Sequence, residues 1–365
     1  MFHLDLYMLT TLLSSAAILI MGVCLGVVSV PKDSELKNYR ISRRFLSVAY
    51  ILLALIGQLE ILGDIDENGR SVLAFTIIGA SYQSMLFTFS IITLINMSYM
   101  TRKRVLYNLI PITLLSIILL TVSEKVFYTI FYIATGLYCM QLIIYIWMFV
   151  KEYGKYTQRL DNFFSENEER RAVWIKQSFY MAACVGIVAI VSLFLNKELY
   201  TIFTVLYAIF YIYFGIKYIN YVTLFHRIAL AVATPLPDHI TPVDRQTNQT
   251  NDDIGYSIEQ WIARKEFLIQ GITLESLAKD LYTNQFYLSR YINSTYRQNF
   301  RSWISFLRIT ESQQLLINRS DLTIIEIGEA VGIPSSSSFY RHFQSVTGMT
   351  PQEYRKQYAE SPFAD

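Results

Sequence analysis

The chain has 365 residues, of which 53% are hydrophobic and only 16% are charged, and its mean hydropathy is +0.32. This composition argues against a wholly soluble protein. The hydrophobic residues are concentrated in roughly the first 220 positions, whereas the last hundred or so have the composition of a soluble domain. The sequence therefore indicates a membrane half that is followed by a water-soluble half.

Seven apolar runs in the first part are long enough to cross a bilayer, because a helix needs about 20 such residues to span about 30 Å of hydrocarbon. No Lys or Arg precedes the first run, and it is too long for the apolar core of a signal peptide, so we expect it to stay in the protein. We predict an all-α fold whose first domain, residues 1–222, is a seven-helix transmembrane bundle. The runs are residues 7–30, 45–63, 72–98, 105–122, 126–150, 177–195 and 199–222.

Lys and Arg are distributed unevenly between the loops that join these runs. The loops after the first, third and fifth runs hold five, three and six of them, whereas the loops after the second, fourth and sixth hold one each. Short loops that are rich in Lys and Arg stay on the cytoplasmic side. The sequence therefore predicts an outside N-terminus and a cytoplasmic C-terminal domain.

The membrane half carries none of the residue patterns of intramembrane hydrolysis. Its cysteines have no metal-ligand spacing, no histidine lies within a run, and no run contains an aspartate. We therefore expect no enzymatic activity, no metal and no cofactor.

A few polar side chains nevertheless lie within the runs. We assign the amides to hydrogen bonds between helices, and Lys217 to a stem that reaches the inner interface. Glu60 is the only acidic residue inside a run, and an ionisable residue at membrane depth is by default a functional candidate. Glu60 is therefore our candidate for a signal site near the outer face, with a structural role as the alternative. The amides are Gln58, Gln83, Asn96, Asn108 and Gln141.

Three stretches outside the runs have their own composition. Residues 223–256 join the two halves: 223–233 are expected to extend the last span as a helix, and 234–255 contain Pro, Thr, Gln and Asn that predict a flexible linker. The stretch 162–175 carries five charges and is interpreted as a solvated helix in a cytoplasmic loop. Residues 359–365 are expected to form a tail.

The soluble part, residues 257–358, contains two pairs of short helices. In the first pair Thr273 is expected to cap one helix, and Asn284 caps the next after a tight turn. In the second pair the first helix stops at Gly332, and Ser335 caps the helix that follows. Two short helices joined by so tight a turn are typical of a helix-turn-helix.

The second pair repeats the first along the chain. The corresponding arginines, Arg290 and Arg341, are 51 residues apart, and between the pairs residues 300–317 have apolar side chains on a helical period. A rigid connecting helix of this kind would hold both pairs on one face, about one turn of DNA apart.

These motifs resemble the DNA-binding domain of the AraC/XylS family of transcription regulators over residues 257–358. The chain departs from the family pattern at Ser312, Gly328, Ile333 and Ser338, and these departures affect packing. The residues that carry the resemblance are Leu277, Ala278, Leu288, Ser289, Arg290, Arg308, Ile309, Leu315, Leu316, Ile324, Glu326, Ile327, Val331, Gly332, Phe339, Arg341, Phe343, Gly348, Met349, Thr350, Pro351, Tyr354 and Arg355.

The resemblance implies that exposed positions of the two reading helices contact bases. Arg can pair with O6 and N7 of guanine, Ser can donate or accept, and an aromatic edge can meet a thymine methyl group. A phosphate contact or an internal salt bridge is the alternative for Arg290 and Arg341. The implied base-reading residues are Phe286, Ser289, Arg290, Ser336, Ser337, Tyr340 and Arg341.

Together these features predict a membrane-embedded one-component transcription regulator of the bacterial inner membrane. Residues 257–358 hold eleven Lys and Arg against nine Asp and Glu, a net charge of +2, so binding is expected to depend on base readout and on a second copy of the chain. The predicted partners are double-stranded DNA, the lipid bilayer, an unknown signal ligand and a homodimer partner on DNA. A membrane-anchored transcription factor without sensing, and a small-molecule carrier with an autoregulatory tail, are the alternatives.

Overall fold

The computed structural model describes residues 6–33, 36–63, 70–166, 169–192, 197–222, 225 and 251–359. In these ranges the secondary structure is helical apart from one isolated β-bridge, as the predicted all-α fold requires. The chain divides into two compact units. One comprises Met1–Tyr156 and Arg171–Ala233, and the other comprises Thr157–Arg170 and Thr234–Asp365.

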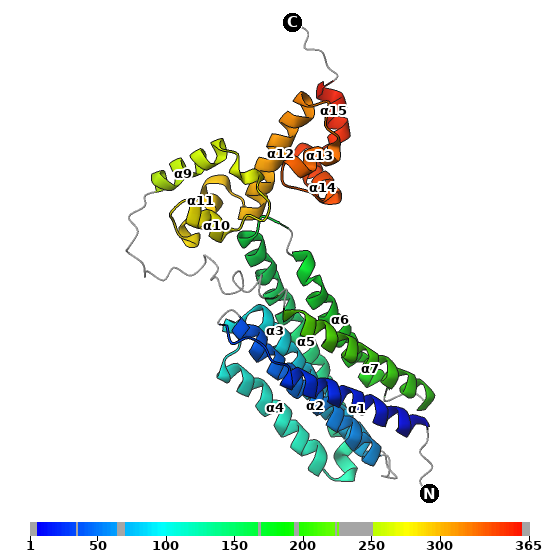
Figure 1. Cartoon of the computed structure of the whole chain (residues 1–365). Helices are drawn as coiled ribbons and strands as arrows, with labels where there is room; N and C mark the ends of the chain where they lie inside the picture. The colour runs from blue at the N-terminus through cyan, green and yellow to red at the C-terminus, as the bar shows by residue number, and fades with distance from the viewer. Residues whose placement is uncertain are drawn as a thin grey trace. The chain divides into compact units, whose positions relative to one another are not determined.

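The first unit is built from seven long apolar helices, which correspond one to one with the seven predicted runs (Figure 1). Each of the seven is long enough and apolar enough to cross a membrane. Of these seven helices, α5 contributes its last turns and α6 its first residues to the second unit, and the rest of each belongs to the first unit. The helices are α1 Leu6–Val27, α2 Lys37–Gly63, α3 Arg70–Ile95, α4 Arg102–Thr121, α5 Glu124–Phe163, α6 Glu169–Ser192 and α7 Lys197–Asn220, with the short 3₁₀ helix η2 Met97–Tyr99 after α3.

Within this unit α2 packs between α1 and α3, α1 also contacts α7, and α4 packs on α3 (Figure 1). Small residues let α1 and α2 approach closely, as is common between membrane helices. A Cβ atom added at Gly22 would lie 2.9 Å from the Cβ of Tyr50, and one added at Gly57 would lie 2.4 Å from the Oγ of Ser15. Larger residues at either glycine would push these two helices apart.

Of the five predicted amides, Asn96, Asn108 and Gln141 form hydrogen bonds to other helices, Gln83 forms none, and the prediction for Gln58 stays untested. Gln141 on α5 donates to a backbone carbonyl of α3 over 2.9 Å. The Tyr145 hydroxyl of α5 donates to the Oδ1 of Asn108 on α4 over 3.0 Å. Gln83 differs, because neither polar atom of its buried amide has a hydrogen-bond partner among the described residues.

The described part of the second unit contains eight helical segments in addition to the end of α5 and the first residues of α6. Helix α9 begins at Asn251, so the prediction that the linker continues to residue 255 was wrong at its C-terminal end. The rest of that linker, residues 234–250, lies outside the described residues, and so does the predicted helical extension over 223–233 apart from residue 225. The segments are α9 Asn251–Ala263, η3 Glu266–Leu268, α10 Leu274–Asp280, α11 Gln285–Tyr296, α12 Phe300–Asn318, α13 Ile324–Ala330, α14 Ser336–Thr347 and α15 Pro351–Ala359.

The predicted N-caps lie at the helix starts. The Oγ1 of Thr273 accepts a hydrogen bond from the Ser276 backbone N–H over 3.0 Å, and the Oδ1 of Asn284 accepts one from Tyr287 over 2.9 Å. Ser335 occupies the N-cap position of α14, but its side chain makes no capping hydrogen bond. Two of the three predicted caps therefore act through their side chains.

The two predicted helix pairs share one geometry. Helices α10 and α13 have 7 residues each, and α11 and α14 have 12 each. In the first turn the Thr283 N–H donates to the carbonyl of Ala278 over 2.9 Å, and in the second the Ile333 N–H donates to Gly328 over 2.8 Å. The residue before each donor is left-handed, Tyr282 with φ 53° and Gly332 with φ 78°. The chain therefore contains two helix-turn-helix units, as predicted.

Helix α12 belongs to the cores of both helix-turn-helix units. Its N-terminal half contributes Trp303 and Ile304 to the core of the first unit, and its C-terminal half contributes Ile309 and Leu316 to the core of the second. Arg308 lies between these two groups and is only 2% exposed. The connecting helix is therefore anchored on both sides, which limits any change in the spacing of the two units.

The Arg308 guanidinium makes three hydrogen bonds to backbone carbonyls. Its Nε donates to Phe267 over 2.8 Å, its Nη2 to Ile269 over 2.6 Å, and its Nη1 to Gly332 over 2.9 Å. Burial lowers the pKa of Arg308 to about 10, so the side chain is still charged at neutral pH. Since Phe267 and Ile269 precede α10 and Gly332 follows α13, one side chain ties the two helix-turn-helix units together.

Candidate nucleic-acid interface

The second helix of each unit, α11 and α14, carries the residues that the sequence assigned to base contacts. Most of these side chains are accessible. Tyr340 is half-buried, and its hydroxyl accepts a hydrogen bond from the Nε2 of Gln352 on α15. The exposed members of the set are Phe286, Arg290, Ser336, Ser337 and Arg341.

Ser289 is the exception in this set, and its predicted exposure was wrong. Its side chain is 7% exposed, and its Oγ accepts a hydrogen bond from the Nδ2 of Asn293 over 3.3 Å. The physical reason is its position on α11, next to Leu288 and three residues before Ile292, both of which are fully buried. Ser289 therefore sits at the edge of the core side of the helix.

Arg290 and Arg341, the two arginines of the predicted set, have accessible side chains in the described part of the chain. Neither Arg290 nor Arg341 forms an ion pair with another residue in the described part of the second unit, and both are exposed. This finding removes the internal salt bridge as an explanation for them. Their assignment to base contacts, with phosphate contacts as the alternative, stays a prediction.

His342 on α14 does not contribute a positive charge to the candidate interface. His342 lies between α14 and α12, with its Nδ1 3.3 Å from the Oγ of Ser305. Burial, followed by the positive charges of Arg301 and Arg341, lowers the pKa of His342 to about 4. The imidazole is therefore neutral at physiological pH, and the nearby positive charge comes from Arg301 and Arg341.

A segment from the loop between α5 and α6 is part of the second unit, which the sequence did not suggest. Asp161 at the end of α5 accepts a hydrogen bond from the Nη1 of Arg301 over 2.7 Å, and the side chain of Arg301 is 14% exposed. The Ser165 N–H donates to the carbonyl of Ile272 over 3.1 Å. The Gly271 N–H donates to the Oε1 of Glu166 over 2.9 Å.

The prediction of a solvated loop helix over residues 162–175 was therefore wrong for its first part. Helix α5 ends at Phe163, which is 3% exposed, and Ser165 is 6% exposed. The adjacent aromatic residues Phe163 and Phe164 were a signal that this charged stretch buries a surface. We name residues 157–166 the α5 tail.

Glu60, the predicted signal residue, lies in α2, but its side chain is outside the described residues. Its role stays a prediction.

Comparison with known proteins points to one family for the C-terminal part. Residues 277–357 match the family model of a helix-turn-helix domain. The HTH-type transcriptional regulator YijO of Escherichia coli strain K12 is 33% identical over 87 residues, which cover 24% of this chain and 30% of that protein. The melibiose operon regulatory protein of the same strain is 31% identical over 87 residues, 24% of this chain and 28% of that protein.

A similar solved structure is the C-terminal domain of AraT, a response regulator from Geobacillus stearothermophilus. It has 28% sequence identity and a TM-score of 0.27, and the match covers 33% of this chain and 95% of that one. The chain spans about a third of the length of the two regulators that it matches.

Proposed function

We propose that this chain, whose C-terminal domain is an AraC-type helix-turn-helix domain, is a membrane-embedded transcription regulator that senses a signal at the bacterial inner membrane. The observation that carries the DNA-binding part is the pair of exposed, unpaired arginines, Arg290 and Arg341, on the second helices of two units that α12 and Arg308 hold together. The domain acts by binding rather than by catalysis. A homodimer on DNA is supported by the small net charge of the domain.

The outward-facing surface of the first unit supports its placement in a membrane. On α4 a row of large apolar side chains, spaced at helical intervals, is more than half exposed. Each would cost free energy in water, at about 25 cal/mol for every Å² of apolar surface, whereas hydrocarbon solvates it well. The row consists of Leu106, Ile110, Leu114 and Ile117.

The proposed orientation is tested with reporter fusions. A reporter that is active only in the cytoplasm is expected to be active when it is fused after Val222 and inactive when it is fused at Asp66, because the Lys- and Arg-rich loops lie on the cytoplasmic side. Fusions are compared at equal protein level. Activity at Asp66 and not after Val222 would contradict the proposed architecture as a whole.

The α5 tail favours sensing over simple anchoring. A regulator that was only tethered would need no contact with its DNA-binding domain apart from the linker, yet Asp161, Ser165 and Glu166 all bind residues of that domain. The carrier alternative has less support, because the sequence of the seven apolar runs shows no paired charged residues of the kind that a transporter needs. We propose that rearrangement of the seven helices alters the position of the α5 tail.

This proposal predicts a regulatory phenotype for Asp161→Asn. The variant removes the charge that Arg301 pairs with but keeps the size of the side chain, and Asp161 lies on neither reading helix. We expect target genes, identified by RNA sequencing of a deletion strain, to lose their response to growth conditions while the regulator still occupies their promoters. The matched control is Asp321→Asn, which breaks an exposed pair with Arg319 in the same unit and should leave regulation unchanged. Normal regulation in both variants would favour the anchoring alternative.

A further inference from the structure

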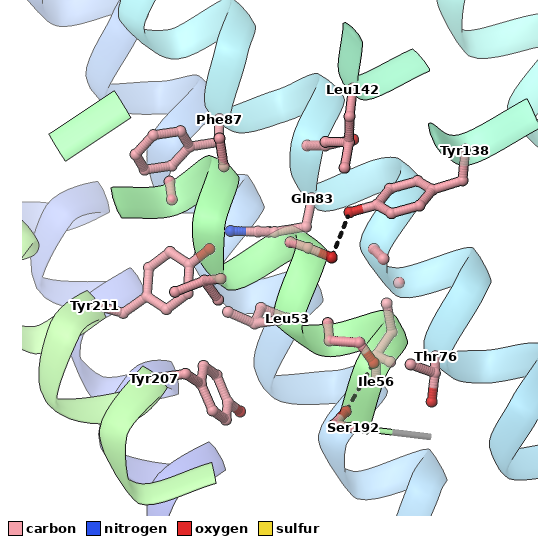
Figure 2. Close-up of a pocket in the computed structure, with 18 of the residues that line it drawn as sticks. Leu53, Ile56, Thr76, Gln83, Phe87, Tyr138, Leu142, Ser192, Tyr207 and Tyr211 are labelled. Atoms are coloured by element: carbon pink, nitrogen blue, oxygen red, sulfur yellow. Dashed lines mark hydrogen bonds between the residues drawn. The ribbon is translucent and has the colours of Figure 1, made fainter. Parts of the chain in front are cut away.

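The first unit contains a partly open cavity of about 110 Å³ that is lined by residues of α1, α2, α3, α5, α6 and α7 (Figure 2). None of the described residues that line it is charged. Aromatic rings form much of the wall, as Figure 2 shows for Phe87, Tyr138, Tyr207 and Tyr211. The described wall of rings and aliphatic side chains, with a few hydroxyl groups and one amide among them, suits a neutral, largely apolar molecule.

Two polar groups in this wall, the Gln83 amide and the Thr11 hydroxyl, have no hydrogen-bond partner among the described residues, and the amide is the larger of the two. Gln83 on α3 is 7% exposed and points into the cavity, with its amide beside the Tyr211 hydroxyl (Figure 2). Neither its amide nitrogen nor its amide oxygen forms a hydrogen bond of good geometry with that hydroxyl or with any other described residue. The Tyr138 hydroxyl, by contrast, already donates to the carbonyl of Gly186 over 3.2 Å. Buried amides are normally satisfied, so an unsatisfied one at a cavity wall indicates a missing partner.

Size and chemistry together restrict what that partner is. An engineered apolar cavity of about 150 Å³ accepts benzene, so a cavity of about 110 Å³ has room for roughly one ring. The Gln83 amide offers one donor group and one acceptor, which match a hydroxyl or a carbonyl. We propose that the cavity binds a small uncharged aromatic molecule that carries a single hydroxyl or carbonyl group, and that Gln83 hydrogen-bonds to that group.

Helix α5, which lines the cavity, also leads to the DNA-binding domain. Tyr138, Leu142 and Tyr145 of α5 line the cavity, and the same helix continues without a break to Phe163 in the α5 tail. A ligand that shifts α5 would therefore act on the element that carries Asp161. The role of the ligand as the signal rests on the proposed function, whereas its binding does not.

The test measures binding to the full chain in lipid nanodiscs with two probes of similar shape, benzyl alcohol and toluene. Each probe is titrated and its dissociation constant is read from the saturable rise in Tm. We compare wild type with Gln83→Met, which removes the amide at nearly constant volume. For each probe we divide the dissociation constant of the variant by that of wild type, so that the partitioning of the probe into lipid cancels. We expect binding of benzyl alcohol to weaken about tenfold in Gln83→Met, and binding of toluene to remain the same within error.

Gln141→Met is the matched control, because that amide is hydrogen-bonded to α3 and its loss should lower the Tm without changing the ratio for either probe. Equal ratios for both probes, or no saturable shift with either, would overturn the proposal. So would a fall in the ligand-free Tm of Gln83→Met as large as that of Gln141→Met, since it would show that Gln83 has a structural partner. If Gln83→Met does not insert, wild type alone decides, because benzoate, which is charged, should not bind.

Loss of the transcriptional response in Glu60→Gln but not in Gln83→Met would move the signal site to the outer end of α2 and overturn the signalling role of the cavity. Loss of the response in Gln83→Met, with promoter occupancy kept, is the expected result. Because binding is measured without DNA, a failure of the cavity proposal is distinguishable from a failure of the proposed regulator function.

Discussion

Arg308→Met is expected to destabilise the DNA-binding unit by about 3 kcal/mol or more, the largest effect of any single substitution proposed for this chain. Methionine follows the stem of the arginine but donates nothing, so the carbonyls of Phe267, Ile269 and Gly332 each lose a donor. A buried acceptor without a donor costs about 1–3 kcal/mol. The loss should be visible as faster amide hydrogen exchange across α10 to α15 in the full chain.

Arg319→Met is the matched control, because its pair with Asp321 is exposed on both sides and its removal should change stability little. Arg308→Lys should fall between the two, since one ammonium group cannot replace a planar fork that reaches three carbonyls. Exchange rates that are equal in Arg308→Met and Arg319→Met would contradict the assigned role of Arg308.

Arg290→Ala and Arg341→Ala are expected to weaken binding to the specific site by about 1–3 kcal/mol each and to relax discrimination at one or two base positions. Both side chains are exposed and unpaired in the described part of the unit, so folding should be unaffected. The measurement is competition between the target site and random DNA at fixed salt, because the phosphate contribution to affinity depends strongly on salt.

Lys279→Ala controls for the loss of one positive charge, since Lys279 lies on the first helix of its unit and pairs with Glu275. It should lower affinity slightly and equally for both DNAs. An equal loss on specific and random DNA in an arginine variant would assign that arginine to the phosphate backbone, and unchanged binding would remove it from the interface.

Local signals carried most of the fold prediction. Each long apolar helix follows from an apolar run of sufficient length, and the paired helices follow from N-caps such as Thr273 and Asn284 together with left-handed turn residues such as Gly332. These features depend on residues within a few positions of each other. The exposure of Arg290 and Arg341 also follows from their helical register.

What the sequence did not predict depends on contacts between distant residues. Asp161 and Arg301 are 140 positions apart, and nothing in the charges of the loop distinguishes docking from solvation. Gln83 and Gln141 are chemically identical amides in apolar runs, and only the packing of the helices shows that the second is satisfied and the first is not. Ser289 was assigned to the exposed face of α11 because the resemblance to the family was carried over position by position. The assignment ignored that Ser289 directly follows the buried Leu288.

Because the α5 tail is part of the second unit, that unit is assembled from two stretches of chain separated by α6, α7 and the linker. During synthesis the α5 tail leaves the ribosome well before α9 to α15 exist, so the DNA-binding domain can be completed only after α6 and α7 have been made. A fragment that starts at Ser257 would lack this piece and leave the backbone N–H of Gly271 and the carbonyl of Ile272 without their partners. Biochemical work on a soluble fragment should therefore add residues 157–166 as a separate peptide.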